Sequence, residues 1–509
     1  MLASLHSVTL AGIDAVACEV EVNVSSRGFS MTQIVGLPDA AVKESLERIR
    51  TAIINCGFES PDRRTIVNLA PADVRKEGPA LDLPIALGML FAEQGVLPDA
   101  LKRFVVAGEL ALDGRTRPVR GALSMAMCAR GGGFDGLLLP RENAGEAAVV
   151  DGLEVIPVGS LTEAVGFLTD QCSIEPATLD LADAFAKASQ YDVDFADVRG
   201  QEFCKRAFTI AAAGGHNVLM VGPPGSGKTL MAKCLPTILP PLTLDESLET
   251  TRIWSSAGKL AVGAALMATR PVRTPHHSAS AAALVGGGSI PQAGEVSLSH
   301  RGVLFLDEFP EFQRSILETL RQPLEDGCIT IARSHSTVRY PAEFMLVAAM
   351  NPCPCGYLGD PRRRCGCSPQ HVERYASRVS GPLLDRIDLH VLASAVPYPE
   401  LRNARPGTDS REMRARVLAA RDRQQCRFGP HRSMLNARMG PRFVRRFCPL
   451  DATGETILRQ AMDELGLSAR AHDKVLRVAR TIADLDDSDA ITAHHVGEAI
   501  QYRQLDRRR

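Results

Sequence analysis

The 509-residue chain lacks a net charge and is poor in aromatic residues. It holds 58 Lys and Arg against 59 Asp and Glu, and aromatic residues make up 5% of it. A nearly neutral chain has no overall attraction to polyanions, so any nucleic-acid contact must come from a local basic patch. A hydrophobic share of 45% is ordinary for a globular protein. The chain is longer than a single domain with one hydrophobic core usually is, so we expect two to four domains.

The sequence also lacks a secretion signal and a long apolar run. Residues 1–6 have neither a basic start nor an apolar stretch, and Asp82 and Glu93 interrupt the most apolar segment, 81–97. A membrane span needs about 20 mainly apolar residues. We therefore expect a cytoplasmic protein with no membrane partner. The 13 cysteines are an odd number scattered along the chain, which argues against a disulfide framework.

One stretch, residues 218–229, carries a complete phosphate-binding motif. An apolar run reads as a buried strand, the loop GPPGSGKT follows, and then comes a helical segment limited by Pro236. The glycines let backbone N–H groups converge on phosphates, Lys228 adds a positive charge, and the Thr229 hydroxyl can ligate Mg²⁺. The strand–loop–helix context argues against a glycine-rich surface loop. The predicted nucleotide ligands are Gly222, Pro223, Pro224, Gly225, Ser226, Gly227, Lys228 and Thr229.

Two further apolar runs end in polar residues. Residues 303–306 are followed by Asp307, placed to hold Mg²⁺, and Glu308, placed to polarise the attacking water. The run 344–350 is followed by Asn351, which fits a position that orients this water. Together with the phosphate-binding loop, these residues predict ATP hydrolysis.

The first 170 residues alternate between strand-like and helix-like patterns, which predicts an α+β layer domain. Three segments resemble the proteolytic domain of Lon-type proteases, which has a ribosomal S5-like fold. They are Lys76–Asp82, Gly108–Val119 and Leu137–Pro140. The position of the family's nucleophilic serine is Ala80 here, and that of its general-base lysine falls near Ser124. A Ser–Lys dyad needs both groups, so we expect a scaffold without peptidase activity.

Four cysteines lie in two close pairs after Asn351. Such a set is typical of a tetrahedral structural zinc site, although the C-x-C spacing is tighter than the commoner C-x-x-C. The alternatives are four reduced surface thiols and, less favoured by the spacing, an iron–sulfur cluster. The predicted zinc ligands are Cys353, Cys355, Cys365 and Cys367.

The core resembles AAA+ ATPases, and this resemblance implies further site residues. Arg386 resembles the arginine finger that reaches the γ-phosphate of a neighbouring subunit, with Arg378 as the competing candidate. Arg470 matches the second sensor of the helical lid. Residues 195–201 correspond loosely to a segment that lines the adenine pocket.

Three basic segments are candidates for contact with DNA. The insertion 250–300 interleaves arginine and histidine with serine and glycine, which suits phosphate contact, or else is a solvated loop. Residues 329–340 read as a hairpin, which in ring-shaped relatives projects into the central channel. A basic helical face over 411–427 is a third, weaker candidate. The predicted DNA contacts are Arg273, His276, Arg333, His335 and Arg339.

The expected fold class is multidomain α/β. We predict a Lon-like domain over 1–170, a linker over 171–198, an AAA+ core of the magnesium-chelatase type over 199–395, and a C-terminal helical lid over 396–509.

Taken together, these motifs resemble the ComM (YifB) family of magnesium-chelatase-like AAA+ ATPases. The resemblance implies ATP and Mg²⁺ as cofactors and a homo-hexameric ring. It also implies a helicase or translocase that promotes branch migration as single-stranded DNA is integrated during natural transformation, with recombination proteins as further partners. Two alternatives stay open: a metal-chelatase motor subunit, and a protein-remodelling ATPase that binds peptides through the Lon-like domain.

Overall fold

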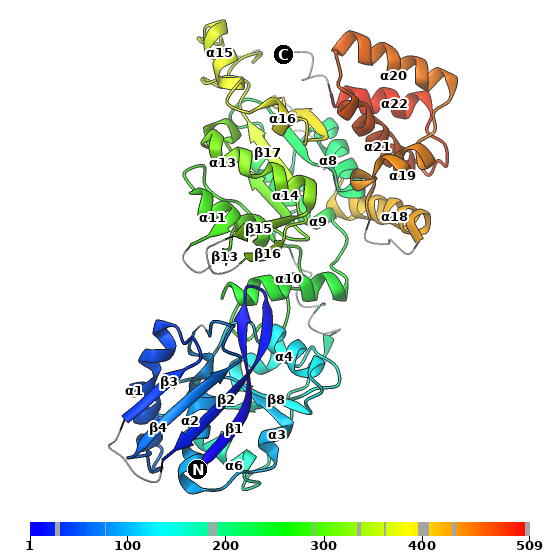
Figure 1. Ribbon diagram of the computed structural model, residues 1–509. Coiled ribbons are helices and arrows are strands. Elements are labelled where there is room, and N and C mark those ends of the chain that lie inside the picture. The colour runs from blue at the N-terminus through cyan, green and yellow to red at the C-terminus, as the bar shows by residue number, and fades with distance from the viewer. Residues whose placement is uncertain are drawn as a thin grey trace. The chain divides into compact units, whose positions relative to one another are not determined.

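The computed structural model describes the chain except for residues 26–30, 77, 182–184, 186–190, 289–290, 333–336, 361–362, 395–406, 430–433 and 504–509. The chain forms two compact units and passes between them several times (Figure 1). The first unit comprises Met1–Ser189, Thr243–Thr269 and Ala332–Tyr340. The second comprises Gln190–Leu242, Arg270–Ile331 and Pro341–Arg509.

The first unit is built on a mixed seven-stranded sheet in the order β3-β4-β2-β1-β5-β8-β9. β1 pairs antiparallel with β2 and β2 with β4, whereas the remaining neighbours are parallel. The strands are β1 (Leu2–Ala11), β2 (Asp14–Val24), β3 (Met31–Val35), β4 (Arg64–Ala70), β5 (Phe104–Val106), β8 (Gly136–Pro140) and β9 (Glu154–Val158). The small pair β6 (Glu109–Leu110) and β7 (Thr116–Arg117) is separate.

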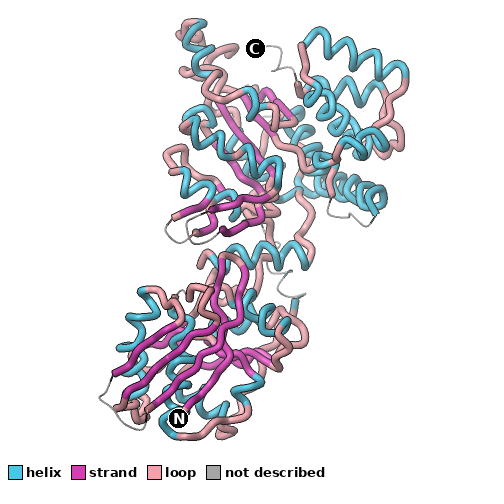
Figure 2. Tube along the Cα trace, in the orientation of Figure 1, coloured by secondary structure: helices cyan, strands magenta, loops and turns pink. Residues whose placement is uncertain are grey.

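Apolar side chains alternate along these strands and feed two cores. Within β5, Phe104 and Val106 belong to one buried cluster and Val105 to the other, as the two-residue period of a strand requires. The first core takes in α1 (Ala40–Asn55), η1 (Pro79–Leu81), α2 (Asp82–Gln94), α3 (Ala100–Arg103) and α6 (Leu161–Leu168). The second takes in α4 (Ala122–Gly131) and α5 (Arg141–Ala147). The sheet is therefore covered by helices on both faces (Figure 2).

Two segments from the middle of the sequence complete the first unit. Helix α10 (Leu244–Ser256) is bound there, since the Ser255 hydroxyl accepts a 2.8 Å hydrogen bond from Gly121 N and Arg252 pairs with Asp14. Strand β16 (Thr337–Pro341) places Val338 against Gly12, where an added Cβ would lie 2.3 Å from Val338 Cγ1. The N-terminal unit thus includes parts of the sequence segment expected to form the ATPase core.

The second unit contains a parallel five-stranded sheet in the order β11-β14-β17-β10-β18. The strands are β10 (Val218–Val221), β11 (Val272–Arg273), β14 (Val303–Leu306), β17 (Met345–Met350) and β18 (Leu389–Leu392). The phosphate-binding loop, the Asp307–Glu308 pair and Asn351 all follow strands of this sheet directly. Because the carboxyl ends of parallel strands meet at one edge, these motifs lie together. The α/β fold class predicted from the sequence is confirmed.

Helices and short elements surround this sheet. Helix α9 runs two residues past Pro236, which was expected to limit it. The elements are η2 (Phe195–Asp197), α8 (Glu202–Gly214), α9 (Lys228–Ile238), α11 (Ala281–Val285), β12 (Gly286–Gly287), β13 (Gln292–Ala293), α12 (Glu295–Leu298), η3 (Phe309–Glu311), α13 (Arg314–Thr319), α14 (Arg321–Asp326), β15 (Cys328–Ala332), α15 (Pro369–Ala376) and α16 (Gly381–Leu384).

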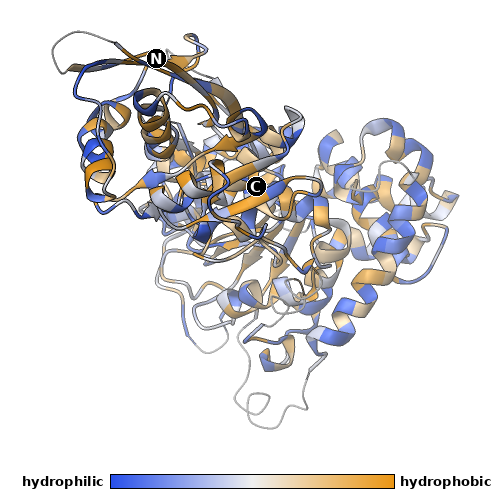
Figure 3. Cartoon of the chain, turned by 90° about the horizontal axis from the view of Figure 1, so that it is seen from below, coloured by the Kyte–Doolittle hydropathy of each residue, from blue (hydrophilic) through white to orange (hydrophobic). Residues whose placement is uncertain are grey.

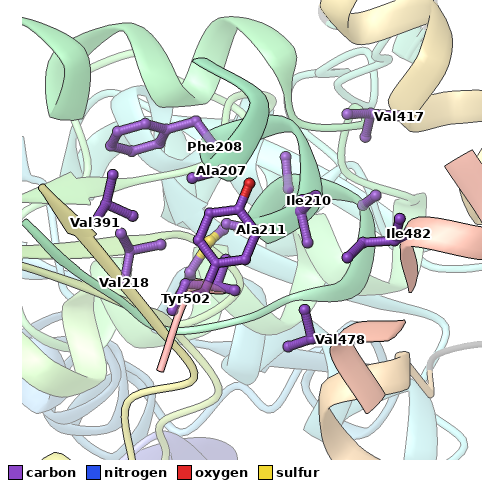
Figure 4. Close-up of a cluster of buried hydrophobic side chains, with 14 of the residues drawn as sticks. Ala207, Phe208, Ile210, Ala211, Val218, Val391, Val417, Val478, Ile482 and Tyr502 are labelled. Carbon is purple, nitrogen blue, oxygen red and sulfur yellow. The ribbon is translucent and has the colours of Figure 1, made fainter. Parts of the chain in front are cut away.

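The C-terminal helices share a core with the sheet. Val218 and Val391 of the sheet, Phe208 of α8, and Val417 and Ile482 of the C-terminal helices belong to one buried cluster (Figure 4). The same helices turn polar faces outward (Figure 3). They are α18 (Ser410–Phe428), η5 (Asn436–Arg438), α19 (Pro441–Phe447), α20 (Ala452–Leu465), α21 (Ala469–Leu485) and α22 (Ala493–Gln501). Among the described residues, no helix combines the length and apolarity that a membrane crossing needs.

A buried ion pair fastens α21 to the sheet. Asp388, directly before β18, lies 2.7 Å from Lys474, and both side chains are at most 10% exposed. Burial opposes the charged carboxylate, but Lys474 and His216 outweigh this and hold the pKa of Asp388 well below its usual range.

We expect Asp388→Asn to lower the free energy of unfolding by about 3 kcal/mol at pH 7, because Lys474 is left buried without its counter-charge. A carboxylate whose pKa is depressed in the folded state stabilises the fold at pH values above its unfolded-state pKa of about 4. This stabilisation is lost as the pH falls toward the folded-state pKa. Thermal melting of wild type and variant should therefore differ at pH 7 and converge well below pH 4. Adding Lys474→Met should recover much of the loss; a double variant as unstable as Asp388→Asn would contradict this account.

Candidate nucleotide site

The loop between β10 and α9 has the backbone of a phosphate cradle. Gly225 and Gly227 have φ of +78° and +84°, a left-handed conformation that favours glycine. Gly222 lies so close to Ala393 O that an added Cβ would be 2.2 Å away. The loop ends at the first turn of α9, where free N–H groups and the helix dipole attract anions. The three glycines of the motif are thus required by the shape of the loop.

Lys228 is buried inside this loop and is held by it. Its Nζ donates to Gly222 O and Pro223 O, each at 2.8 Å, and lies 3.4 Å from Asn351 Oδ1. Burial lowers the pKa of Lys228, while the charge of Asp307 opposes that shift. The predicted phosphate-binding lysine and the predicted water-orienting amide are therefore within reach of the same point.

A pair of oxygen ligands lies beside Lys228. The Thr229 hydroxyl donates to Asp307 Oδ2 at 2.8 Å. A hydroxyl and a carboxylate in contact form the oxygen-rich donor set that Mg²⁺ prefers. The residues present fit the ion, and Thr229 and Asp307 would hold it while it neutralises charge on the phosphates.

Glu308 has an unusual backbone and a side-chain partner that the sequence did not reveal. Its φ is +51°, and its N–H donates to Asp307 Oδ1 at 2.9 Å. Its carboxylate lies 2.9 Å from Nδ1 of His277. His277 was not among the predicted site residues, because a contact between positions 31 residues apart has no local signal.

The segment before α8 contacts the phosphate loop. Phe195 is fully buried in the core, and Asp194 caps the short helix η2. The Gln201 amide donates to Ser226 O at 3.3 Å and to Ser394 O at 2.5 Å. The segment 195–201 thus adjoins the phosphate loop.

Arg386 and Arg470 lie together, at the opposite edge of the sheet. Both line one cavity of about 560 Å³ with Arg438, Lys474 and Arg477. The cavity also touches Asn217, just before β10, whose side chain donates to Arg386 O at 3.0 Å. Strands rise about 3.3 Å per residue, so a four-residue strand separates this edge from the phosphate loop by about 13 Å.

Each of the two candidate arginine fingers, Arg386 and Arg378, forms an ion pair with an acidic residue of its own chain. Arg386 pairs with Glu325 and donates to Pro382 O at 2.5 Å, and its side chain is 10% exposed. Arg378, the competing candidate, is half-exposed and pairs with Glu311 at 2.7 Å. The two candidates therefore occupy different environments, and Arg386 is the one that shares a cavity with Arg470.

The four clustered cysteines converge. The sulfur of Cys353 lies 3.4 Å from that of Cys355 and 3.7 Å from that of Cys365, and all four sulfurs, including Cys367, lie within 4.8 Å of one another. Sulfurs bound tetrahedrally at about 2.3 Å from zinc are about 3.8 Å apart. Backbone N–H groups of Tyr357 and Gly366 lower the pKa of Cys355 to about 6. The cluster fits a structural Zn²⁺.

We expect the purified protein to carry one equivalent of zinc per chain. Elemental analysis should find it in wild type and lose it in Cys355→Ser, because three thiolates hold Zn²⁺ less firmly than four. Gly356 packs on Pro224 of the phosphate loop, with an added Cβ 2.6 Å from Pro224 Cδ, so loss of metal should also weaken nucleotide binding. Cys426→Ser, at an exposed cysteine of α18, is the matched control. Wild-type protein free of zinc would refute the site.

The predicted DNA contacts are only partly described. Arg333 and His335 lie outside the described residues. Arg339 on β16 and His276 are exposed. Arg273 is engaged with Glu295, its Nη2 donating to Oε1 at 2.8 Å.

The basic face of α18 is largely used within the protein. Arg421 donates to Ala212 O at 2.6 Å, and Arg427 pairs with Asp484. Arg423 pairs with Asp487. These three arginines stabilise the packing of α18, so the face is less suited to phosphate contact than the sequence indicated.

The positions of the Lon-type dyad hold no such pair. Ala80 lies in η1, and the Ser124 hydroxyl donates to Ile13 O at 2.6 Å. Arg252 of α10 donates to the same hydroxyl at 3.4 Å. A serine nucleophile is absent at the family's position, as the sequence indicated.

Comparisons with known proteins agree with this architecture. Family models for subunit ChlI of magnesium chelatase match residues 194–401, 20–143 and, for its C-terminal part, 407–503. The YifB protein of Escherichia coli is 43% identical over 99% of this chain and 98% of its own length. The competence protein ComM of Haemophilus influenzae is 41% identical over 99% and 98%. The chain belongs to the ComM (YifB) family.

Part of this chain is also similar to Lon proteases, as the sequence analysis expected of the N-terminal domain. The Lon protease of Rhizobium meliloti is 30% identical over 136 residues, which is 24% of this chain and 17% of that protease. The predicted resemblance to the ComM (YifB) family, with a Lon-like N-terminal part, is thereby confirmed. Membership of a family with magnesium-chelatase-type AAA+ domains indicates an ATPase that uses ATP and Mg²⁺.

Proposed function

We propose that this ComM-family protein is an ATP-driven DNA motor, a helicase or translocase acting on single-stranded or branched DNA during natural transformation and homologous recombination. The ATPase part rests on the buried Lys228 beside the Thr229–Asp307 pair. The link to DNA uptake rests on the relative named competence protein ComM. Exposed His276 and Arg339 supply basic contacts.

The location of the arginines supports the homo-hexameric ring of this proposal. Arg386 and Arg470 line a cavity at the amino ends of the strands, while the phosphate loop follows the carboxyl end of β10. An arginine that stabilises developing phosphate charge must contact the γ-phosphate. Arg386 meets this need in a head-to-tail ring, where each protomer presents its cavity to the next nucleotide. This placement is the observation that carries the proposal.

A steady-state ATPase assay of the full-length protein tests the proposal. We expect forked or three-stranded DNA to raise the ATPase rate and to be remodelled, with little effect of protoporphyrin or unfolded polypeptide. The affinity of the protein for DNA should fall steeply as the salt concentration rises, because contacts with DNA phosphates release counterions. Stimulation by protoporphyrin together with a chelatase partner would favour a metal-chelatase motor, and stimulation by polypeptide alone a protein-remodelling ATPase; either result would refute the DNA role.

A further inference from the structure

A short segment between β17 and α16 projects from the second unit. Residues 352–376 without 361–362, which we call the cysteine projection, contain the four converging cysteines and helix α15. Figure 1 shows α15 at the margin of this unit, away from its parallel sheet. The Ser368 hydroxyl, directly after the last cysteine, accepts a hydrogen bond from His371 N at 3.3 Å and caps α15. The cysteine cluster and the helix therefore form one continuous element.

Two contacts fix the base of the cysteine projection at the nucleotide edge of the sheet. Gly356 is buried, and an added Cβ would lie 2.6 Å from Cδ of Pro224 in the phosphate loop. Tyr375 of α15 is 6% exposed, and its hydroxyl oxygen accepts a hydrogen bond from the backbone of Asn351. The base of the projection is thus held by the protein, while its outer surface is open to a ligand.

The outer surface carries arginines without acidic partners. Arg363, Arg364 and Arg374 are exposed, and in the part of the chain that the structure describes none of them forms an ion pair. Arg363 Nη1 donates to the Tyr357 hydroxyl at 2.7 Å, and its Cζ lies 5.1 Å from the centre of that ring. An arginine held over a neutral aromatic ring keeps its charge. His371 lies three residues before Arg374 on α15, so both face the same side of the helix.

The acidic residues of the cysteine projection leave these charges largely uncompensated. Asp360 Oδ1 accepts from the backbone N–H of Arg363 at 3.2 Å. Glu373 is exposed on α15 and, like the arginines, forms no ion pair with a described residue. The arginine side chains are therefore not engaged by the acids beside them.

The arginines do not serve the cysteine cluster either. With Zn²⁺ bound, four thiolates keep a net negative charge, which nearby arginines could neutralise. The groups that face the sulfurs are instead backbone N–H groups: those of Tyr357 and Gly366 donate to Cys355, and Cys367 N lies 3.4 Å from Cys365 Sγ. Among the described side chains, no arginine donates to a sulfur of the cluster. The arginines are thus available to an external anion.

A single-stranded nucleic acid matches this surface. Exposed arginines without partners bind phosphate oxygens, often through two hydrogen bonds each. An arginine beside an aromatic ring also offers a face on which an unstacked base can stack, which is typical of sites for single strands. We propose that the outer surface of the cysteine projection, with Arg363, Arg364 and Arg374, binds single-stranded DNA. This inference rests on the proposed DNA motor and adds a contact site beyond those predicted from the sequence.

Fluorescence anisotropy with a labelled single-stranded oligonucleotide and the full-length protein tests this site. The triple variant Arg363→Ala, Arg364→Ala, Arg374→Ala should bind at least about tenfold more weakly than wild type. The slope of log affinity against log salt concentration should become shallower by about 2, because each phosphate contact with a single strand contributes about 0.7. Replacing the same three arginines with lysine keeps the charge and should restore most of the slope. The melting temperature and metal content should match wild type, which would show that the projection is folded.

The matched control removes three exposed arginines of α19 and α20, in the variant Arg442→Ala, Arg445→Ala, Arg459→Ala. It should bind DNA as wild type does, and an equal loss in this control would overturn the site. Affinity and salt slope unchanged in the first variant would overturn the site and leave the DNA motor standing, whereas a wild-type protein that binds no DNA would refute the motor itself. A loss confined to duplex DNA would overturn the assignment to single strands. A changed oligomeric state in sedimentation would assign the surface to the subunit interface instead.

Discussion

Replacing Lys228 with alanine is expected to reduce ATP hydrolysis at least about a hundredfold, the effect typical of removing one preorganised charge contact in a phosphoryl-transfer site. Lys228 is buried within the loop, and its ammonium group is held by Gly222 O and Pro223 O at 2.8 Å. ATP would replace these neutral acceptors with phosphate oxygens.

The measurement is steady-state ATPase activity together with nucleotide-induced thermal stabilisation. Saturating ATP raises the melting temperature of wild type by mass action, and Lys228→Ala should lose most of that shift. Lys233→Ala, on the exposed side of the same helix α9, is the matched control because it removes the same charge five residues further along the helix. Retention of more than about a tenth of the wild-type rate in Lys228→Ala would contradict the assignment of the loop.

The nucleotide site could be predicted from the sequence because its parts are local. A strand, a glycine-rich turn and a helix are contiguous in residues 218–238, and Asp307 directly follows a strand. Parallel pairing of β14, β17 and β10 then brings the motifs to one edge of the sheet. Sequence spacing alone was sufficient for these residues because each motif occupies the end of its own strand.

The contacts that the sequence did not predict join distant segments. Arg252 pairs with Asp14 across 238 positions and holds α10 to the N-terminal unit. Arg386 and Arg470 share a cavity only because α21 packs on the sheet through Asp388 and Lys474. Neither arrangement has a local pattern, since each depends on how helices dock. The contact between His277 and Glu308 was missed for the same reason.

The position of Arg386 predicts a large loss of ATP turnover when this arginine is removed. Arg386→Ala should reduce ATP turnover at least about a hundredfold while nucleotide binding stays near the wild-type level, because the guanidinium stabilises charge that develops only in the transition state. Arg386 lies at the amino end of β10, next to Asn217. It therefore contributes nothing to binding at its own phosphate loop. ATPase kinetics and a fluorescent-nucleotide titration measure the two quantities separately, and Arg378→Ala is the control arginine.

Mixing two inactive variants decides whether Arg386 acts on a neighbour. Glu308→Gln keeps the arginine and loses the catalytic carboxylate, whereas Arg386→Ala keeps the carboxylate. In a head-to-tail ring assembled from equal amounts, about a quarter of the interfaces combine an intact carboxylate with an intact arginine, so about a quarter of wild-type activity should return. An arginine acting within its own chain gives no recovery, because every protomer then lacks one group. Failure of mixed rings to regain activity, with subunit exchange verified, would therefore show that Arg386 does not act on a neighbour's nucleotide, and would remove the geometric basis for the ring.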